Sequence, residues 1–147
     1  GKALGAGVPI GAILLSQAVA DAVSPGDHGT TYGGNLLSCR AALVFLEFLT
    51  QGGLQRVHEA GSRLAAGLNT LAERYPLLSD VRGAGLMRGL EMPADAATQV
   101  VDAAMSRGLL VNRTAGTVVR MLPPLTVTDA EVDKALGILD DSLATLS

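Results

Sequence analysis

The sequence predicts an α/β protein of the α+β kind, in which a small antiparallel sheet carries helices on one face. From about Gly53 onward the pattern runs helix, strands, helix, strands, helix. Too few residues separate the paired strands for parallel crossovers, so antiparallel pairing is expected. Hydrophobic residues make up 48% of the 147 residues and aromatic residues only 3%, so Leu, Val and Ala must fill the core. A chain of this size buries roughly two-thirds of its unfolded surface.

Residues 1–52 form a predicted domain of a different kind. A glycine-rich loop is followed by a dense apolar run, Val8–Ser16, which predicts a short buried strand. A short helix is expected over Gln17–Val23 and a loop over Asp27–Asn35, where glycines and turn formers oppose regular structure. The helix predicted from Asn35 to Thr50 is apolar almost all round, which indicates burial on most sides by other protein. We therefore expect residues 1–52 to be part of a larger domain.

Residues 53–147 form the second predicted domain. A long amphipathic helix is expected up to Pro76, because a single apolar stripe recurs at helical spacing: Leu54, Val57, Ala60, Leu64, Leu68, Leu71 and Tyr75. Further elements are expected in this order: strands at Val81–Gly83 and Leu86–Met92, a helix at Ala96–Arg107, and strands at Leu109–Asn112 and Val118–Leu122. Thr128 and Glu131 form a capping box that begins the last helix.

Composition argues against several classes of protein. The net charge of −3 gives no broad basic surface for nucleic acid, and no apolar run approaches the ~20 residues that span a bilayer. Cys39 is the only cysteine, which fits a reducing cytoplasm. With His28 and His58 far apart, the spacing of metal ligands is absent and no metal site is expected. The chain begins with Gly1 and not Met, so we expect a piece of a longer polypeptide.

Lysine is rare in this chain, and its two positions differ in character. Lys134 lies opposite the apolar stripe of the last helix and is expected to face water. Lys2 lies in the run Gly1–Ala12, among glycine and apolar residues that can desolvate an amine and favour its neutral, nucleophilic form. For imine chemistry, Lys2 is the predicted residue.

Three further positions are candidates for binding. Thr30 and Thr31 bring hydroxyls to a glycine-rich loop before a helix, an arrangement that suits a phosphate, although an ordinary turn is the alternative. Arg82 follows an apolar strand and is suited to bidentate binding of a carboxylate, or else it pairs with Asp80 or faces solvent. For Arg120, a structural or surface role is expected.

Three motifs in register resemble the class III pyridoxal-phosphate (PLP) aminotransferases, and most closely their acetylornithine-type members. They are Gly1–Ala12, Gly26–Asn35 and Asp80–Met87, and Gly108–Asn112 and Val119–Thr128 add to the likeness. The resemblance covers essentially the whole chain. It implies the C-terminal part of a fold type I PLP-dependent transferase, with a remnant of the PLP-binding large domain at 1–52 and the small domain at 53–147. Leu36 stands where the family usually has proline.

The resemblance also implies a role for each candidate residue. Lys2 is expected to bind PLP covalently and to move the substrate proton, and Thr31, with Thr30 beside it, to bind the cofactor phosphate of the neighbouring subunit in a homodimer. Arg82 is expected to hold a substrate carboxylate. The implied reaction moves an amino group from N-acetylornithine or a similar ω-amine to 2-oxoglutarate, in arginine biosynthesis.

Other functions remain open at this point. Within the family, the amine is alternatively ornithine, succinylornithine or a 4-aminobutyrate-type compound, or the chemistry is that of a decarboxylase or racemase of the same fold. A non-catalytic association module is the alternative from another class, because the apolar helix predicts association. The family's upstream half, which carries the partner of the pyridine nitrogen, is outside this sequence, so the polypeptide alone is not expected to be active.

Overall fold

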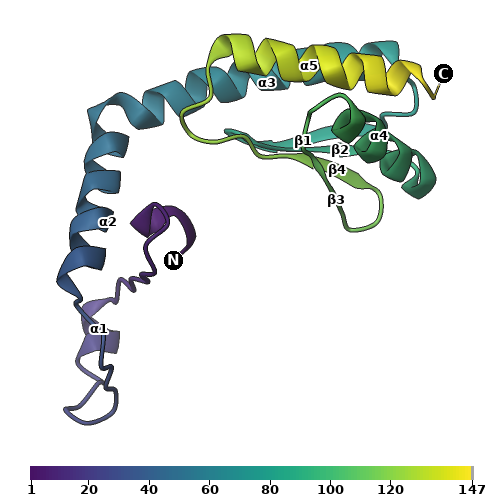
Figure 1. The fold of residues 1–147 in the computed structure, drawn as a ribbon. Helices are drawn as coiled ribbons and strands as arrows, with labels where there is room; N and C mark the ends of the chain where they lie inside the picture. Colours follow the sequence, from purple (N-terminus) through teal and green to yellow (C-terminus); the bar gives the residue numbers. More distant parts are fainter. Residues whose placement is uncertain (147) are drawn as a thin grey trace. The chain divides into compact units, whose positions relative to one another are not determined.

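The computed structural model describes residues 1–146, and Ser147, the last residue of the second predicted domain, lies outside the described residues. The chain divides into two compact units, one from Gly1 to Gly52 and the other from Gly53 on. Figure 1 shows the elements of each unit. Within the described residues, no helix is long and apolar enough to cross a membrane.

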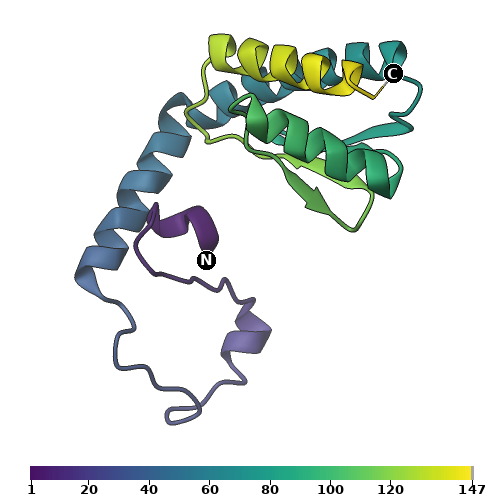
Figure 2. The same cartoon turned by 45° about the vertical axis from the view of Figure 1, so that its right-hand side comes forward.

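The second unit is an antiparallel sheet with three helices on one face, as the sequence predicts (Figure 2). The strand order is β1-β2-β4-β3, and all neighbouring strands are antiparallel. The elements are α3 (Leu54–Arg74), β1 (Asp80–Ala84), β2 (Met87–Glu91), α4 (Ala94–Ser106), β3 (Asn112–Thr114), β4 (Val118–Met121) and α5 (Asp129–Ala144). The strand expected at Leu109–Asn112 is displaced: only the segment beside β4 finds a partner in the ladder, and it begins at Asn112.

The core of this unit lies between the sheet and the three helices. Leu68 of α3, Leu90 of β2 and Leu139 of α5 have no exposed surface. The predicted stripe of α3 is buried from Ala60 onward, whereas Leu54 at its start is 61% exposed. Burial of leucine and valine side chains contributes about 1.5–3 kcal/mol each. The unit therefore has a hydrophobic core of its own.

Local polar contacts fix α5 on this core. The Thr128 hydroxyl accepts a hydrogen bond from the Glu131 amide, and the Glu131 carboxylate accepts one from the Thr128 amide, so the predicted capping box is confirmed. Arg63 of α3 donates two hydrogen bonds to Asp133, at 2.7 and 2.6 Å. The Tyr75 hydroxyl donates to Asp140 at 2.6 Å. These contacts hold α3 and α5 side by side.

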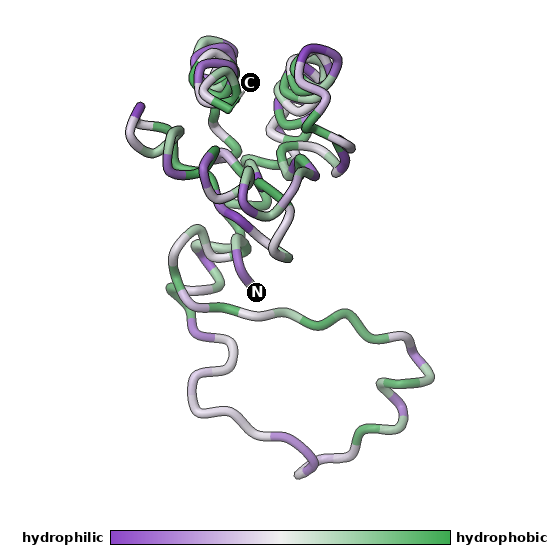
Figure 3. The backbone as a smooth tube through the Cα atoms, turned by 90° about the vertical axis from the view of Figure 1, so that its right-hand side faces the viewer, coloured by the Kyte–Doolittle hydropathy of each residue, from purple (hydrophilic) through white to green (hydrophobic). Residues whose placement is uncertain are grey.

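The first unit contains little regular structure before residue 36. Its elements are the 3₁₀ turn η1 (Lys2–Gly5), α1 (Gln17–Ala20), α2 (Leu36–Phe48) and the irregular turn η2 (Leu49–Gly53). The strand predicted at Val8–Ser16 is wrong, because the described residues of this unit offer no second strand for it to pair with. Its apolar side chains are instead exposed, Ile13 by 82% and Leu14 by 98%. Figure 3 colours much of this N-terminal loop as hydrophobic.

Helix α2 begins where the sequence predicts but is not buried within the described chain. The Asn35 side chain accepts hydrogen bonds from the amides of Leu37 and Ser38, both at 3.1 Å, and so caps the helix. Of the helix, only Ala42 is buried, while Leu36 and Leu37 are 85% and 80% exposed. Within its own unit, α2 thus lacks the burial that its sequence predicts.

Candidate functional site

Lys2 has an unusual backbone conformation. Its φ is +56°, in the left-handed region that residues with a Cβ rarely adopt, and it begins η1 with an exposed side chain. Such strain costs of order 1–3 kcal/mol and concentrates at functional sites. The other lysine, Lys134, lies on α5, exposed as predicted and without a left-handed backbone. The conformation thus distinguishes the predicted lysine from the only other one.

The loop that carries Thr30 and Thr31 is shaped by glycine. A Cβ on Gly33 would lie 2.2 Å from the Thr30 methyl carbon, so only glycine lets the two residues approach this closely. Gly34 follows with φ +69°. Both threonine side chains are exposed. The loop therefore holds the Thr30 side chain close to the residues that lead into α2.

A cavity of about 700 Å³ lies in the first unit beside this loop. Thr30 lines it, together with Ser38 and Cys39 of α2 and the segment Pro9–Ala12. Lys2 and Thr31 are not among its lining residues. The structure thus does not place the amine of Lys2 and the hydroxyl of Thr30 in one cavity.

Arg82 lies on β1 and is fully engaged in ion pairs. Its guanidinium donates to Asp80 at 2.8 Å and to Glu91 of β2 at 2.6 Å. A hydrogen bond from Thr117 and then the pairing with Arg82 hold the pKa of Glu91 below its usual range. The pKa of Arg82 is raised, chiefly by Glu91 and then by Asp80. The two carboxylates outweigh the single positive charge, so Arg82 is not a free site for an anion.

Arg120 on β4 is the opposite case. Its Nε is buried and has no hydrogen-bond partner among the described residues, and no ion pair to its guanidinium occurs there either. A buried donor without a partner costs free energy, more so on a charged group. Of the two arginines, Arg120 is therefore the one whose charge is not paired among the described residues, a feature that the sequence did not predict. This difference is visible only in the folded sheet, because strand pairing brings carboxylates to Arg82 and none to Arg120 among the described residues.

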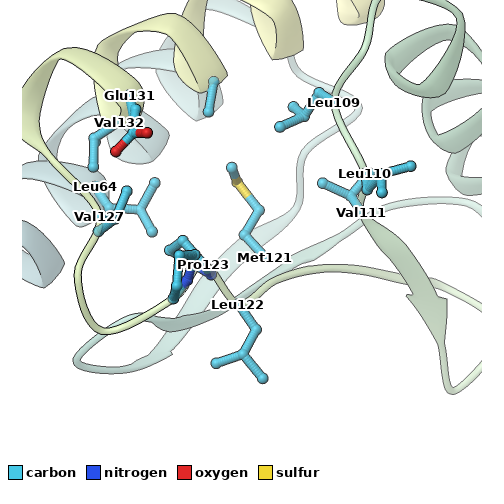
Figure 4. Close-up of a pocket in the computed structure, with 12 residues that line it drawn as sticks. Leu64, Leu109, Leu110, Val111, Met121, Leu122, Pro123, Val127, Glu131 and Val132 are labelled. Atoms are coloured by element: carbon cyan, nitrogen blue, oxygen red, sulfur yellow. The ribbon is translucent and has the colours of Figure 1, made fainter.

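The second unit also holds an apolar cavity of about 310 Å³ beneath α5. In Figure 4, Leu64, Met121 and Val132 lie around it. Glu131 is its only charged lining residue, and that carboxylate already accepts from Thr128. Ligand sites combine apolar walls with free polar groups that orient the ligand. This cavity has no such free charged group.

Comparison with known proteins agrees with this fold. The family profile described as Aminotransferase class-III matches residues 1–143. An acetylornithine aminotransferase of Caldanaerobacter subterraneus subsp. tengcongensis is 42% identical over 99% of the chain, and one of Gloeobacter violaceus is 46% identical over 99%. A solved ornithine aminotransferase of Toxoplasma gondii superposes with a TM-score of 0.79 at 33% identity, over 86% of this chain and 31% of that one.

The antiparallel sheet with its helices is a fragment of the α/β fold of fold type I PLP-dependent transferases. The chain belongs to the class III aminotransferase family, because the family profile matches nearly all of its residues. The chain spans 37% and 36% of the length of the two curated relatives. The chain therefore corresponds to a little over a third of the length of each of these relatives.

The residues present fit parts of the family cofactor. Lys2 offers an amine on a strained backbone, and the Gly33 contact creates a close loop in which Thr30 presents a hydroxyl suited to a phosphate. Lys2 does not line the cavity of Thr30, so the first unit does not bring its amine and this hydroxyl together in that cavity.

Proposed function

We propose that the full-length protein is a PLP-dependent aminotransferase that moves an amino group from N-acetylornithine, or a similar ω-amine, to 2-oxoglutarate. The observation that carries the proposal is identity of 42–46% over nearly the whole chain with relatives named acetylornithine aminotransferase. The solved ornithine aminotransferase of Toxoplasma gondii holds PLP, at partial occupancy, in its active site. Arginine biosynthesis in the cytoplasm follows as the proposed setting.

Lys2 is the proposed catalytic residue. PLP, when bound, would supply the electron sink that lets the carbon bearing the reacting amino group lose its proton. The Lys2 amine would hold the cofactor and would accept and return the proton of the reacting substrate carbon. General acid–base catalysis of this kind contributes about 10²–10⁴-fold. The left-handed backbone of Lys2 supports this role.

Borohydride reduction tests the assignment of Lys2. In the full-length protein loaded with PLP, reduction is expected to leave the pyridoxyl label on the peptide that contains Lys2. Lys2→Ala should lose the label and at least about a hundredfold in kcat. Lys134→Ala is the matched control, since it removes the only other lysine of this chain from an exposed helix position, and it should keep both. A label on another residue would overturn the assignment.

Arg82 and Arg120 are the two candidates for the substrate carboxylate. Arg82 was predicted, yet its guanidinium already pairs with Asp80 and Glu91. The unpartnered Nε of Arg120 favours Arg120 as the carboxylate ligand, with Arg82 two strands away on the sheet. Replacing each by Gln in the full-length protein separates them. Arg120→Gln should raise KM for 2-oxoglutarate by about 10–100-fold, the loss expected for a hydrogen bond to a charged group.

A homodimer with shared active sites is proposed on the separation of Lys2 from the Thr30 cavity. In this arrangement Thr31 reaches the cofactor phosphate of the neighbouring subunit. Subunit mixing tests it: Lys2→Ala and Thr31→Glu proteins, each inactive, should regain roughly a quarter of wild-type activity when hybrid dimers form, because half the dimers carry one intact site. No recovery would place Lys2 and Thr31 of one subunit in the same site.

A non-catalytic association module is the second candidate, and the exposed apolar residues of α2 favour it. A full-length protein that sediments as an oligomer, without PLP absorbance and without transamination, would establish this function over catalysis. Another amine substrate within the family is separated from N-acetylornithine by comparing kcat/KM for ornithine, succinylornithine and 4-aminobutyrate.

A further inference from the structure

Arg88 of β2 has its side chain on the helix side of the sheet. It is two residues from Leu90 on the same strand, and Leu90 lies in the core between sheet and helices, so the two share a face. The guanidinium donates three hydrogen bonds, all to backbone carbonyl oxygens: from Nε to Gly85 at 2.9 Å, from Nη1 to Gly83 at 2.9 Å, and from Nη2 to Gly61 of α3 at 3.2 Å. Among the described residues, no carboxylate pairs with Arg88. This side chain therefore joins the hairpin of β1 and β2 to α3.

The hairpin and α3 touch through their backbones at this point. A Cβ on Gly61 would lie 2.6 Å from the carbonyl carbon and oxygen of Gly85, so no side chain separates the helix from the turn. Gly85 has a φ of +52°, and Leu86, the second residue of the turn, is buried. The planar guanidinium presents its N–H groups in fixed directions, which suits it to hold several carbonyls at once. Arg88 thus fixes the distance and the orientation of the hairpin against α3.

The hairpin also carries the middle of the cross-strand row in which both candidate arginines lie. Arg88 immediately precedes Gly89. Gly89 is directly opposite Arg82 of β1 and Arg120 of β4. Arg88 itself is directly opposite Met121, the residue that follows Arg120. Side chains alternate between the faces of a strand, so both candidate arginines lie on the face opposite to that of Arg88. A shift of β2 on α3 would therefore move the row from behind.

We propose that Arg88 is a positioning residue for binding of the oxo-acid carboxylate. Its three hydrogen bonds hold β2 on α3, and β2 in turn sets where the two candidate arginines lie on the other face of the sheet. The inference rests on the proposed function for the identity of the oxo acid, and it holds whichever of the two arginines binds the carboxylate. Misplacement of a binding group by about 1 Å costs up to about a hundredfold. Loss of the Arg88 hydrogen bonds should therefore weaken binding of the oxo acid.

Glutarate, a dicarboxylate without the oxo group, is the probe in the full-length protein loaded with PLP. In Arg88→Met, which removes all three donors, its Kd by calorimetry should rise about tenfold. KM for 2-oxoglutarate should rise in parallel, with kcat nearly unchanged. Arg88→Lys keeps a charged donor group and should recover part of the affinity. A purely structural role would instead lower kcat and the thermal midpoint through loss of folded protein, and would leave Kd and KM unchanged.

A glycine variant tests the same contact from the side of α3. Gly61→Ala places a methyl group 2.6 Å from the Gly85 backbone and pushes the hairpin away from the helix, so Kd for glutarate should again rise about tenfold. Gly137→Ala is the matched control on α5, because a Cβ there meets no atom within 4 Å, and it should leave Kd unchanged. Arg107→Met is the control for loss of an arginine, since Arg107 donates to the Ala103 carbonyl of the adjoining helix α4. It should also leave Kd unchanged.

The variants separate the inference from the proposed function. Wild-type Kd and KM in Arg88→Met, or in Gly61→Ala, would overturn the inference, and so would an equal rise of Kd in the two control variants. Should Arg88→Met fail to fold, Arg88→Lys and Gly61→Ala provide the same comparison. Absence of transamination by a wild-type protein that binds glutarate would instead overturn the proposed function, because glutarate binding requires no reaction.

Discussion

The two units of the chain contrast in how they treat apolar side chains. Beyond Gly53, leucines of α3, β2 and α5 are fully buried against one another. Before Gly53, Leu14 and Leu37 are 98% and 80% exposed, and Ala42 and Gly5 are among the few buried residues. Hydrophobic composition is therefore not sufficient for a core. The elements must also have neighbours of complementary shape within reach.

The two units also differ in how they hold the candidate site residues. The second unit positions Arg82, Gly89 and Arg120 through a sheet whose strands are all paired with neighbours in the same unit. The first unit carries Lys2 and the threonine loop on segments that lack such a frame. Strand pairing within the second unit therefore fixes the two arginines, whereas no strand pairing fixes Lys2 among the described residues.

Hydrogen exchange gives the largest expected difference between the units. In the 147-residue chain, amides of Leu64–Leu71 should exchange at least about a thousandfold more slowly than those of residues 8–16, because only global unfolding exposes the former. In the full-length protein, residues 8–16 should become protected as other protein covers them. Equal amide exchange rates in both units of the 147-residue chain would contradict this difference.

Core truncation is expected to have the next largest effect. Leu68→Ala should lower the free energy of unfolding by about 2–5 kcal/mol, because it leaves a cavity in a fully buried site. Leu37→Ala, the same substitution at a position 80% exposed, should stay within about 0.5 kcal/mol. Urea denaturation followed by circular dichroism measures both. A comparable loss in the two variants would show that α2 is buried in solution.

Helix caps offer a finer comparison. Thr128→Ala removes the capping box of α5 and should cost about 0.5–2 kcal/mol in the cooperative unfolding of the second unit. Asn35→Ala removes the corresponding cap of α2 and should reduce helical signal without shifting that transition. A shift of the transition by Asn35→Ala would mean that the two units unfold together.

Acid should weaken the contact between α3 and α5, with the smallest effect. The Tyr75 hydroxyl and then Arg74 hold the pKa of Asp140 below its usual range. A carboxyl with a lowered folded-state pKa contributes stability above its unfolded pKa of about 3.9 and loses it as pH falls through the folded value. The thermal midpoint should therefore drop as pH falls below about 4.

Asp140→Asn should lower the midpoint at pH 7 and reduce its further loss in acid. Asp102→Asn is the control for net charge, since Asp102 is an exposed residue of α4 without an ion pair among the described residues. The same flattening in Asp102→Asn would assign the acid sensitivity to overall charge and not to the α3–α5 contact.

Much of the second unit was predictable because its signals are local. The stripe of α3 and the Thr128 capping box each specify an element from a few neighbouring residues. The strand predicted at Val8–Ser16 failed for the opposite reason. A strand is completed by hydrogen bonds to a partner segment. The apolar pattern of one segment carries no information about whether such a partner exists.

The sequence by itself determined the family, the antiparallel α+β architecture and Lys2 as the candidate for imine chemistry, because motifs and periodicity are written in consecutive residues. Only the tertiary structure distinguishes the surroundings of the two arginines. Asp80 and Glu91 pair with Arg82, whereas Arg120, two strands away across Gly89, keeps a buried nitrogen without a partner among the described residues. Strand pairing sets these neighbours, and charge acts through space and not along the chain.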